Sequence, residues 1–208
     1  KRLLQLKFIF TLKKFKKDGT KFTCLTCYDS MFARMMEKAE IDTILIGDSL
    51  GMVVQGHDST LPVTVDDMAY HTANISRSNK QALILADLPF MSYVTLPEAI
   101  ANSRKLMQAG AHVIKIEGGS ELCDLVTTLA QAGTPTCVHL GLTPQSVNVF
   151  GGYKVQGRGD EAGQKLLDDA KAVVNAGAAL LVLECVPAAL AKAVTEAVAV
   201  PVIGIGAG

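Results

Sequence analysis

Short apolar segments rich in β-branched residues alternate along the chain with longer segments in which apolar residues recur at helical spacing. The short segments predict strands, because each one stops after a few residues at a charge or a glycine. Seven strands are expected, at residues 22–27, 43–46, 82–86, 113–116, 136–138, 180–183 and 201–205. Strands that are apolar on both faces and joined by helical segments indicate a parallel sheet covered on both sides.

The segments between the strands carry the start and stop signals of helices. Two of them have the spacing of amphipathic helices: Leu122, Leu125, Val126, Leu129 and Ala130, and then Leu166, Ala170, Val173 and Val174. Thr64 and Thr95 each stand three residues before an acid, as in a capping box. Glycines stand where helices should end, at Gly110, Gly133 and Gly177. Repeated strand–helix units of this kind leave two folds, a doubly wound sheet or a closed barrel.

A potential metal ligand or proton carrier follows five successive predicted strands: Asp48, Asp87, Glu117, His139 and Glu184. In a barrel the C-terminal ends of the strands converge on one mouth, where the active site is built, whereas a doubly wound sheet spreads them along an edge. Each acid alone could merely cap the turn or helix that follows it. Five such residues in succession favour a β/α barrel with an active site at its mouth.

Lys115 lies two residues before Glu117, so both side chains leave the predicted strand on the same face. If that face points to the barrel axis, the lysine needs an anion there. A substrate carboxylate and a structural ion pair with Glu117 would each supply one, and the two roles could coexist. Carboxylate oxygens outnumber nitrogens among the potential ligands, which points to Mg²⁺ or a similar divalent cation completed by substrate and water.

Other polar and glycine-rich segments carry weaker signals. Residues 141–162 are rich in glycine and lie between a predicted strand and its helix, so we expect them to form a mobile lid. Three late glycines fit a phosphate cradle and, equally well, close backbone packing: Gly204, Gly206 and Gly208. The histidines other than His139 stand in a polar loop or in or beside predicted helices: His57, His71 and His112.

Composition narrows the class of protein. The chain has 208 residues, of which 49% are hydrophobic, so one domain is expected. Twenty basic residues balance twenty acidic ones, which gives no electrostatic signal for a nucleic acid or an anionic membrane surface and favours a small-molecule partner. Apolar runs stay far below the roughly 20 residues of a membrane span. Five cysteines, an odd number in segments of regular structure, indicate a reducing cytoplasm.

Two local features have alternative interpretations. Residues 1–17 hold seven basic residues and no acid, which predicts a short amphipathic helix at one end of the domain, with a targeting role as the alternative. Cys24 and Cys27 form a CxxC, but positions three apart in a strand point to opposite faces. The redox form of this motif belongs at the start of a helix, so a structural role is expected.

Several longer motifs closely resemble the ketopantoate hydroxymethyltransferase family from about Phe22 to the last residue. They are IGDSLG at 46–51, GHDSTLPVT at 56–64, LADLPF at 85–90, IKIEGG at 114–119, HLGLTPQSVN at 139–148, GGYKVQGRG at 151–159, LLVLECVP at 180–187 and PVIGIGAG at 201–208. The resemblance implies a (β/α)₈ TIM barrel of the phosphoenolpyruvate mutase/isocitrate lyase-like type, with seven strands present in this chain. It also implies a single barrel domain over residues 1–208 whose C-terminal part is missing, so a polypeptide ending at Gly208 is expected to be inactive alone.

The resemblance further implies transfer of a hydroxymethyl group from 5,10-methylenetetrahydrofolate to 3-methyl-2-oxobutanoate, with Mg²⁺, in a cytoplasmic homo-oligomer, often a decamer. Carried over position by position, Asp48, Asp87 and Glu117 correspond to metal contacts, and Asp48, Ser49, Asp87 and Lys115 correspond to substrate contacts. Glu184 corresponds to the catalytic base that forms the enolate. Of these residues, the strand-end pattern alone would have passed over Ser49.

Two rival functions remain at this point. The related lyases and mutases also hold 2-oxo acids on Mg²⁺ but make or break other bonds, and the Lys-Lys-Cys-Gly-His loop of the lyases is absent from this sequence. A binding protein for oxo acids could keep the metal ligands and Lys115 but would not need a carboxylate at position 184.

Overall fold

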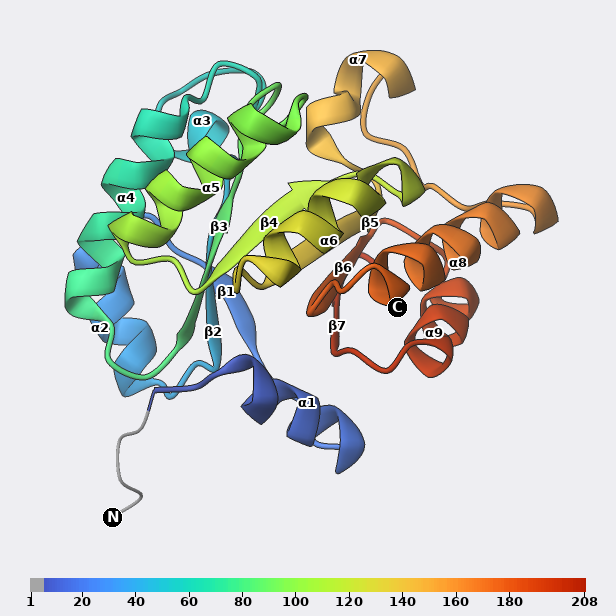
Figure 1. Ribbon diagram of the computed structural model, residues 1–208, viewed down its shortest axis with the longest axis horizontal. Helices are drawn as coiled ribbons and strands as arrows, with labels where there is room; N and C mark the ends of the chain where they lie inside the picture. Colours follow the sequence, from blue (N-terminus) through green and yellow to red (C-terminus); the bar gives the residue numbers. More distant parts are fainter. Residues whose placement is uncertain (1–5) are drawn as a thin grey trace. The chain divides into compact units, whose positions relative to one another are not determined.

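A computed structural model describes residues 6–208, which divide into unit 1, ending at Lys115, and unit 2 (Ile116–Gly208). Unit 1 contains α1 (Ile9–Lys17), β1 (Cys24–Thr26), α2 (Ser30–Lys38), β2 (Thr43–Ile46), α3 (Leu50–Val53), α4 (Val65–Ser78), β3 (Leu83–Asp87), α5 (Leu96–Ala109) and the start of β4 (Val113–Glu117) (Figure 1). Unit 2 contains the end of β4, then η1 (Ser120–Leu122), α6 (Cys123–Gln131), β5 (Thr136–Gly141), η2 (Pro144–Ser146), α7 (Val147–Phe150), α8 (Asp160–Asn175), β6 (Leu180–Glu184), α9 (Ala188–Ala197) and β7 (Val202–Ile205).

The described residues hold seven strands in one sheet, in the order β1-β2-β3-β4-β5-β6-β7. Neighbours pair in parallel: β1 with β2, β2 with β3 and β3 with β4 in unit 1, then β5 with β6 and β6 with β7 in unit 2. Parallel neighbours in chain order require a crossover after each strand, and helices supply most of these crossovers. The predicted alternation of strands and helices is confirmed.

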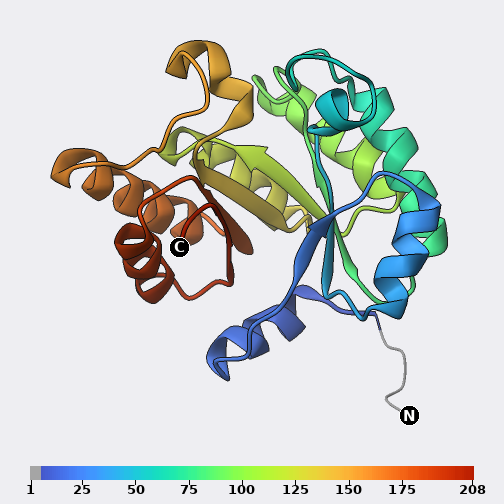
Figure 2. The same ribbon diagram turned by 180° about the vertical axis from the view of Figure 1, so that it is seen from behind.

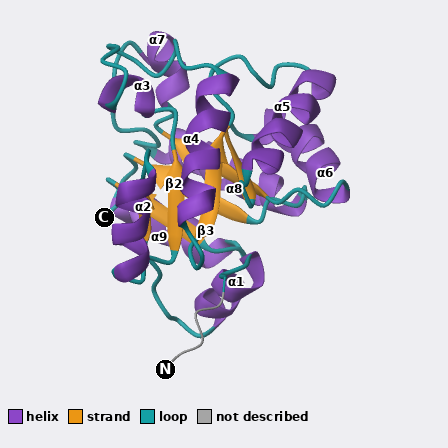
Figure 3. Cartoon of the chain, turned by 90° about the vertical axis from the view of Figure 1, so that its left-hand side faces the viewer, coloured by secondary structure: helices purple, strands orange, loops and turns teal. Residues whose placement is uncertain are grey.

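Strands β2 to β6 are largely buried under helices, whereas β1 and β7 are partly exposed. All five residues of β3 and all five of β4 are buried, and apart from Asp87, Lys115 and Glu117 they are apolar. In unit 1, α2 and α4 lie in front of β2 and β3 (Figure 3), and α4 adds Met68 and Ile75 to the core. In unit 2, β6 is similarly buried from Leu180 to Leu183. No described helix has the length and apolar character needed to cross a bilayer.

Two predicted strands differ from the structure by more than one residue at an end, and four others differ by a single residue at one or both ends. The first strand was expected at 22–27 but is only Cys24–Thr26. The fifth was expected to stop at Val138 but continues to Gly141, because β5 keeps pairing with β6 through His139, Leu140 and Gly141. His139 therefore lies inside its strand rather than after it.

The helix signals hold with one exception. Thr64 caps α4 by a complete capping box, in which its hydroxyl accepts from the Asp67 N–H at 3.1 Å and its own N–H donates to the Asp67 carboxylate at 2.9 Å. Helix α5 begins after Thr95 as predicted, but the Thr95 side chain makes no capping hydrogen bond within the described part of the chain. The three predicted stop glycines follow α5, α6 and α8 with positive φ: Gly110, Gly133 and Gly177.

The N-terminal helix predicted within residues 1–17 is α1, and residues 1–5 of that prediction lie outside the described residues. It buries Leu12 and lies at the end where β1 begins (Figure 2). All five cysteines of the sequence lie in the described part, and none of them forms a disulfide there.

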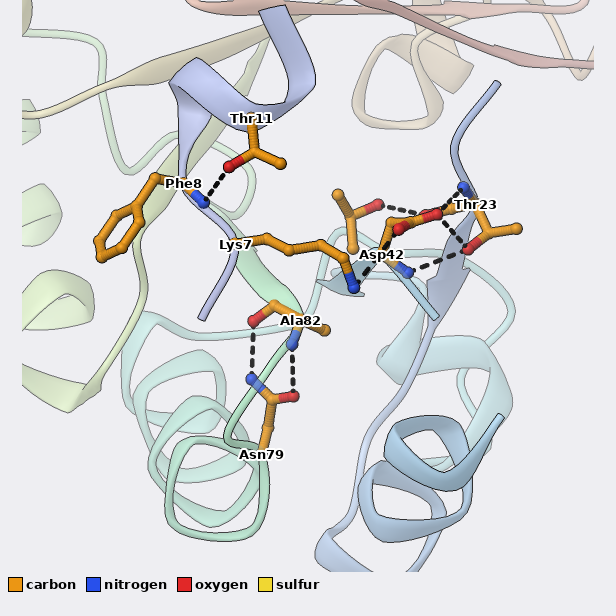
Figure 4. A network of polar contacts seen from close by, with 8 residues as sticks. Lys7, Phe8, Thr11, Thr23, Asp42, Asn79 and Ala82 are labelled. Carbon is orange, nitrogen blue, oxygen red and sulfur yellow. Dashed lines mark hydrogen bonds and ion pairs between the residues drawn. The ribbon is translucent and has the colours of Figure 1, made fainter. Parts of the chain in front are cut away.

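A polar network joins the segment before α1 to the starts of β1 and β2 (Figure 4). The Asp42 carboxylate accepts from the Thr23 N–H at 2.8 Å and the Thr23 hydroxyl at 3.1 Å, and lies 3.3 Å from the Lys7 ammonium. The Asp42 N–H donates back to the Thr23 hydroxyl at 3.0 Å. This exchange fixes β1 beside β2 at the end of the strands away from Asp48 and Asp87.

Asp42→Ala is expected to lower the free energy of unfolding by about 1–3 kcal/mol, because the Thr23 donors and Lys7 lose their acceptor. Urea unfolding measures the loss. Asp18→Ala is the control: it removes the exposed pair with Lys14 and should cost less than about 1 kcal/mol. Equal losses in the two variants would contradict a structural role for the Asp42 network.

Candidate active site

An ion pair between Asp87 and Lys115 forms the centre of the site in unit 1. Asp87 is the last residue of β3, and Lys115 stands directly beside it in the register of β4. The Lys115 ammonium lies 2.9 Å from Asp87 Oδ1, and both side chains are almost fully buried, 4% and 3% exposed. A buried ammonium without an anion is costly, and the Asp87 carboxylate supplies an anion beside Lys115. The sequence had not offered Asp87 as a partner of this lysine, and an ion pair of Lys115 with Glu117 stays a prediction.

Asp48 reaches the same place from the end of β2. It is 3% exposed, and its N–H donates to Asp87 Oδ2 at 3.1 Å. A Cβ atom on the preceding Gly47 would lie 2.8 Å from Ser49 Oγ and 3.5 Å from Asp87 Oδ2. The glycine of the GDS sequence therefore leaves the space in which these polar side chains approach each other.

Ser49 is held by a tyrosine that the sequence analysis did not select. The Tyr28 hydroxyl lies 2.8 Å from Ser49 Oγ, and His71 Nδ1 lies 2.6 Å from the Tyr28 carbonyl oxygen. Burial raises the pKa of the Tyr28 phenol, and the nearby Asp87 and Asp48 carboxylates raise it further, so this hydroxyl stays protonated. Tyr28 follows β1 just as Asp48 follows β2. The strand-end pattern selected only acids and a histidine, so it passed over this phenol.

The carboxylates of unit 1 fit a hard divalent cation. Asp48 and Asp87 end neighbouring strands, are buried and interact directly, and Mg²⁺ is commonly bound by one or two carboxylates with water and substrate oxygens as the remaining ligands. Within residues 6–208 no three His, Cys, Asp or Glu side chains are grouped so as to hold a metal alone. Carboxylate oxygens are the donors that Mg²⁺ prefers, whereas structural zinc sites are built mainly from Cys and His.

In unit 2 a histidine stands between two carboxylates. His139 Nδ1 lies 3.3 Å from Glu117 Oε1, and His139 Nε2 lies 3.3 Å from Glu184 Oε2. Glu117 Oε2 also accepts from the Gln145 N–H at 3.0 Å. Glu117 and His139 are buried, whereas Glu184 is 23% exposed and so remains accessible. Since a neutral imidazole carries one N–H, only the protonated ring can donate to both acids.

The backbone around Glu184 is tightly fixed. Cys185, the next residue, has φ 48°, a left-handed conformation that is uncommon for a residue with a side chain. Its N–H donates to the Ile205 carbonyl at 2.9 Å, and its carbonyl accepts from the Gln156 N–H at 2.9 Å. A Cβ on Gly141 would lie 2.3 Å from the Glu184 carbonyl oxygen, so this position requires glycine. These contacts set the direction in which Glu184 leaves β6.

A cavity of about 340 Å³ opens beside His139, entirely within unit 2. The turn after β4 and the end of β5 form one side, and α7, the following loop and the first half of α8 form the other. Its lining includes Phe150 and Gln156 from the segment predicted to be a lid. The mobility of that segment stays a prediction.

The predicted residues thus fall into two groups. Unit 1 brings together Asp48, Ser49, Asp87 and Lys115, and unit 2 brings together Glu117, His139 and Glu184. Of the late glycines, Gly206 packs against Cys185 and Gly208 against Ala188, which supports the packing interpretation over a phosphate cradle.

Comparison with solved structures defines the class. The fold resembles 2,3-dimethylmalate lyase, a PEP mutase/isocitrate lyase superfamily member, with a TM-score of 0.67 and 16% identity over 94% of this chain and 70% of that one. It also resembles phosphonopyruvate hydrolase in complex with oxalate and Mg²⁺, with a TM-score of 0.67 and 13% identity over 96% of this chain and 81% of that one. The chain therefore has the parallel β/α barrel fold of this superfamily, as the sequence predicted.

Sequence comparison defines the family within this class. A family model described as ketopantoate hydroxymethyltransferase matches residues 7–208. The 3-methyl-2-oxobutanoate hydroxymethyltransferase of Psychrobacter arcticus is 96% identical over 95% of this chain and 74% of that protein. The enzyme of the same name from Acinetobacter baylyi is 64% identical over the same shares of the two chains. The chain belongs to the ketopantoate hydroxymethyltransferase family.

Proposed function

We propose that this protein transfers a hydroxymethyl group from 5,10-methylenetetrahydrofolate to 3-methyl-2-oxobutanoate, forming ketopantoate for pantothenate and coenzyme A synthesis. The observation that carries the proposal is the 96% identity to a relative named for this reaction. The geometry of unit 1 supports it, because a 2-oxo acid offers a carboxylate and a keto oxygen to a site that combines two acids with a buried lysine.

In this proposal the residues of unit 1 bind and orient the oxo acid. Asp48 and Asp87 hold Mg²⁺, which when bound supplies Lewis-acid stabilisation for charge that develops on the keto oxygen. Lys115 offsets the charge of the substrate carboxylate, and Ser49 donates a hydrogen bond to the substrate. Glu117, two residues after Lys115 in β4, is proposed as a further metal contact, as the sequence resemblance implies.

Glu184 takes the role of general base. It removes the proton from C3 of the oxo acid. The methylene carbon is bonded to two folate nitrogens, and opening of one of these bonds, with a proton taken up by the departing nitrogen, gives an iminium that the enolate carbon attacks. Cleavage of the second carbon–nitrogen bond then releases tetrahydrofolate, with water supplying the hydroxyl oxygen of the product and a proton to the folate nitrogen. His139 lies within 3.3 Å of Glu184, so it can share the proton that Glu184 receives.

A product assay on the full natural chain tests the proposal. With both substrates and Mg²⁺, ketopantoate should form. Chelation with EDTA should stop its formation, and added Mg²⁺ should restore it. Product formation that is insensitive to chelation would contradict the metal assignment, and no ketopantoate under any of these conditions would contradict the function.

Tyr28→Phe is expected to raise the KM for 3-methyl-2-oxobutanoate about fivefold, because Ser49 loses a hydrogen-bond partner worth ~1 kcal/mol. The effect should fall on the KM for the oxo acid and leave the KM for folate unchanged, since Tyr28 acts through Ser49. Steady-state kinetics with each substrate varied in turn measures both. Tyr70→Phe, an exposed tyrosine on α4, is the matched control. Equal effects of the two substitutions would contradict a positioning role for Tyr28.

We also propose that the protein works as a cytoplasmic homo-oligomer, a decamer as the resemblance implies. Three large apolar side chains of α2 support this, because Met31, Phe32 and Met35 are each more than half exposed. Light scattering of the full chain would give its mass directly.

A further inference from the structure

The cavity of unit 2 has the size and lining of a small-molecule site, and the function proposed above assigns no ligand to it. Its volume of about 340 Å³ lies at the lower end of the ~300–1,000 Å³ of typical ligand pockets, so it suits one ring system rather than a whole folate. Leu140, Phe150 and Leu166 give it apolar surface against which a planar ring can pack. His139 also lines the cavity and lies 3.3 Å from Glu184.

A buried carboxylate is one of the polar groups that line this cavity. Asp169, on α8, is 9% exposed. Its Oδ1 accepts from the Ser120 N–H at 3.2 Å, and its Oδ2 lies 2.6 Å from the Lys165 ammonium. A Cβ on Gly119 would lie 2.7 Å from the Asp169 carboxylate, so the turn after β4 is shaped around this acid.

Asp169 remains an acceptor after these contacts. Burial by itself would raise the pKa of the Asp169 carboxyl, but hydrogen bonds from Lys165 and Ser120 outweigh burial and hold it below its ordinary value. A carboxylate has about four lone-pair sites, and the two contacts above occupy only part of them. Lys165 is 73% exposed, so its ammonium can move into solvent when another donor arrives.

Resting on the function proposed above, we propose that this cavity binds the pterin ring of methylenetetrahydrofolate and that the Asp169 carboxylate recognises it. The pterin edge carries an N–H and an amino group side by side, and a carboxylate can accept from both at once. The apolar side chains would cover the ring, and His139 marks the side of the cavity toward Glu184. The cavity would thus place the carbon donor beside the residues assigned to proton transfer.

Two variants of the full natural chain test the proposal. Asp169→Asn keeps the shape of the side chain but replaces one acceptor with a donor, so the KM for methylenetetrahydrofolate should rise at least about tenfold. Ala162→Leu fills the cavity from the first turn of α8 and leaves the Asp169 contacts in place, so it should raise the same KM. Asp168→Asn, a neighbouring exposed acid of the same helix, is the matched control and should change nothing.

Further readouts separate the possible failures. A methyl-substituted tetrahydropterin, which has the ring but no tail, should inhibit the wild type competitively against methylenetetrahydrofolate and lose potency in both variants. The proposal would be overturned if either variant kept the wild-type KM for methylenetetrahydrofolate and the wild-type inhibition by the pterin. In particular, a loss seen in Asp169→Asn but absent from Ala162→Leu would be ascribed to altered folding around Asp169. Exchange of the C3 proton of the oxo acid needs no folate. Exchange and ketopantoate formation by the wild type therefore test the proposed function independently of the cavity. If both occur but a variant shows the wild-type folate KM and pterin inhibition, only the cavity assignment is overturned.

Discussion

Glu184→Gln is expected to abolish exchange of the C3 proton of 3-methyl-2-oxobutanoate with deuterated solvent, even without folate. General-base catalysis typically contributes about 10²–10⁴-fold, and glutamine keeps the size of the side chain but cannot take up the proton. Binding of the divalent metal and of the oxo acid should stay near normal, because the proposal assigns both to Asp48, Asp87 and Lys115. Proton NMR in deuterated buffer measures the exchange, and calorimetry measures the binding.

The control for this substitution is Glu196→Gln, an exposed acid of α9 that pairs with Lys192 at 3.9 Å. It changes the same functional group at the surface of the same unit and should leave exchange unchanged. Near-wild-type exchange in Glu184→Gln would assign the base to another residue. His139, which lies within 3.3 Å of both Glu117 and Glu184, would be the next to test.

Asp87→Asn is expected to weaken binding of Mg²⁺, or of Mn²⁺ as its paramagnetic substitute, by about a hundredfold or more. Substitution of residues that only hydrogen-bond to metal ligands typically lowers metal affinity about 10–100-fold, and Asp87 is proposed as a ligand itself. Asparagine keeps an oxygen that can accept from the Asp48 N–H. Asparagine also removes the carboxylate charge beside Lys115, but unlike alanine it keeps a polar side chain of the same size there, so Asp87→Asn is the milder substitution. Electron paramagnetic resonance of bound Mn²⁺ gives the affinity.

The comparison for Asp87→Asn is Asp66→Asn, which alters the exposed pair of Asp66 with Lys105 and should leave metal affinity unchanged. A divalent-metal requirement that persists unaltered in Asp87→Asn would remove Asp87 from the metal site. A matching loss in both variants would indicate a general effect of charge rather than a ligand.

Much of this site could be predicted from the sequence because strand ends are easy to locate. An apolar run such as ALILA that ends at Asp87 indicates both the strand and the residue at its C-terminal end. The period of two along β4 likewise places Lys115 and Glu117 on one face. What the pattern could not give was the pairing of Lys115 with Asp87, because the register between β3 and β4 brings them side by side and no local sequence signal encodes that register.

The remaining features depend on contacts between distant segments. Tyr28 reaches Ser49 across 21 positions, and Asp169 reaches Ser120 across 49, so neither pair leaves a periodic trace in the sequence. The extension of β5 through His139 was missed for a similar reason, since its hydrogen bonds to β6 decide where the strand ends. The Asp42 network was also hidden, because an acid before a strand looks like an ordinary turn residue.

The transfer of a labelled carbon tests the central claim most directly. The full chain would be incubated with Mg²⁺, 3-methyl-2-oxobutanoate and methylenetetrahydrofolate that carries a carbon-13 label in its methylene group, and a parallel sample would receive 2,3-dimethylmalate. The family assignment predicts that the label appears in the hydroxymethyl carbon of ketopantoate and that dimethylmalate is not cleaved. Cleavage of dimethylmalate without label transfer would place the chain with the lyases that share its fold and contradict the proposed function.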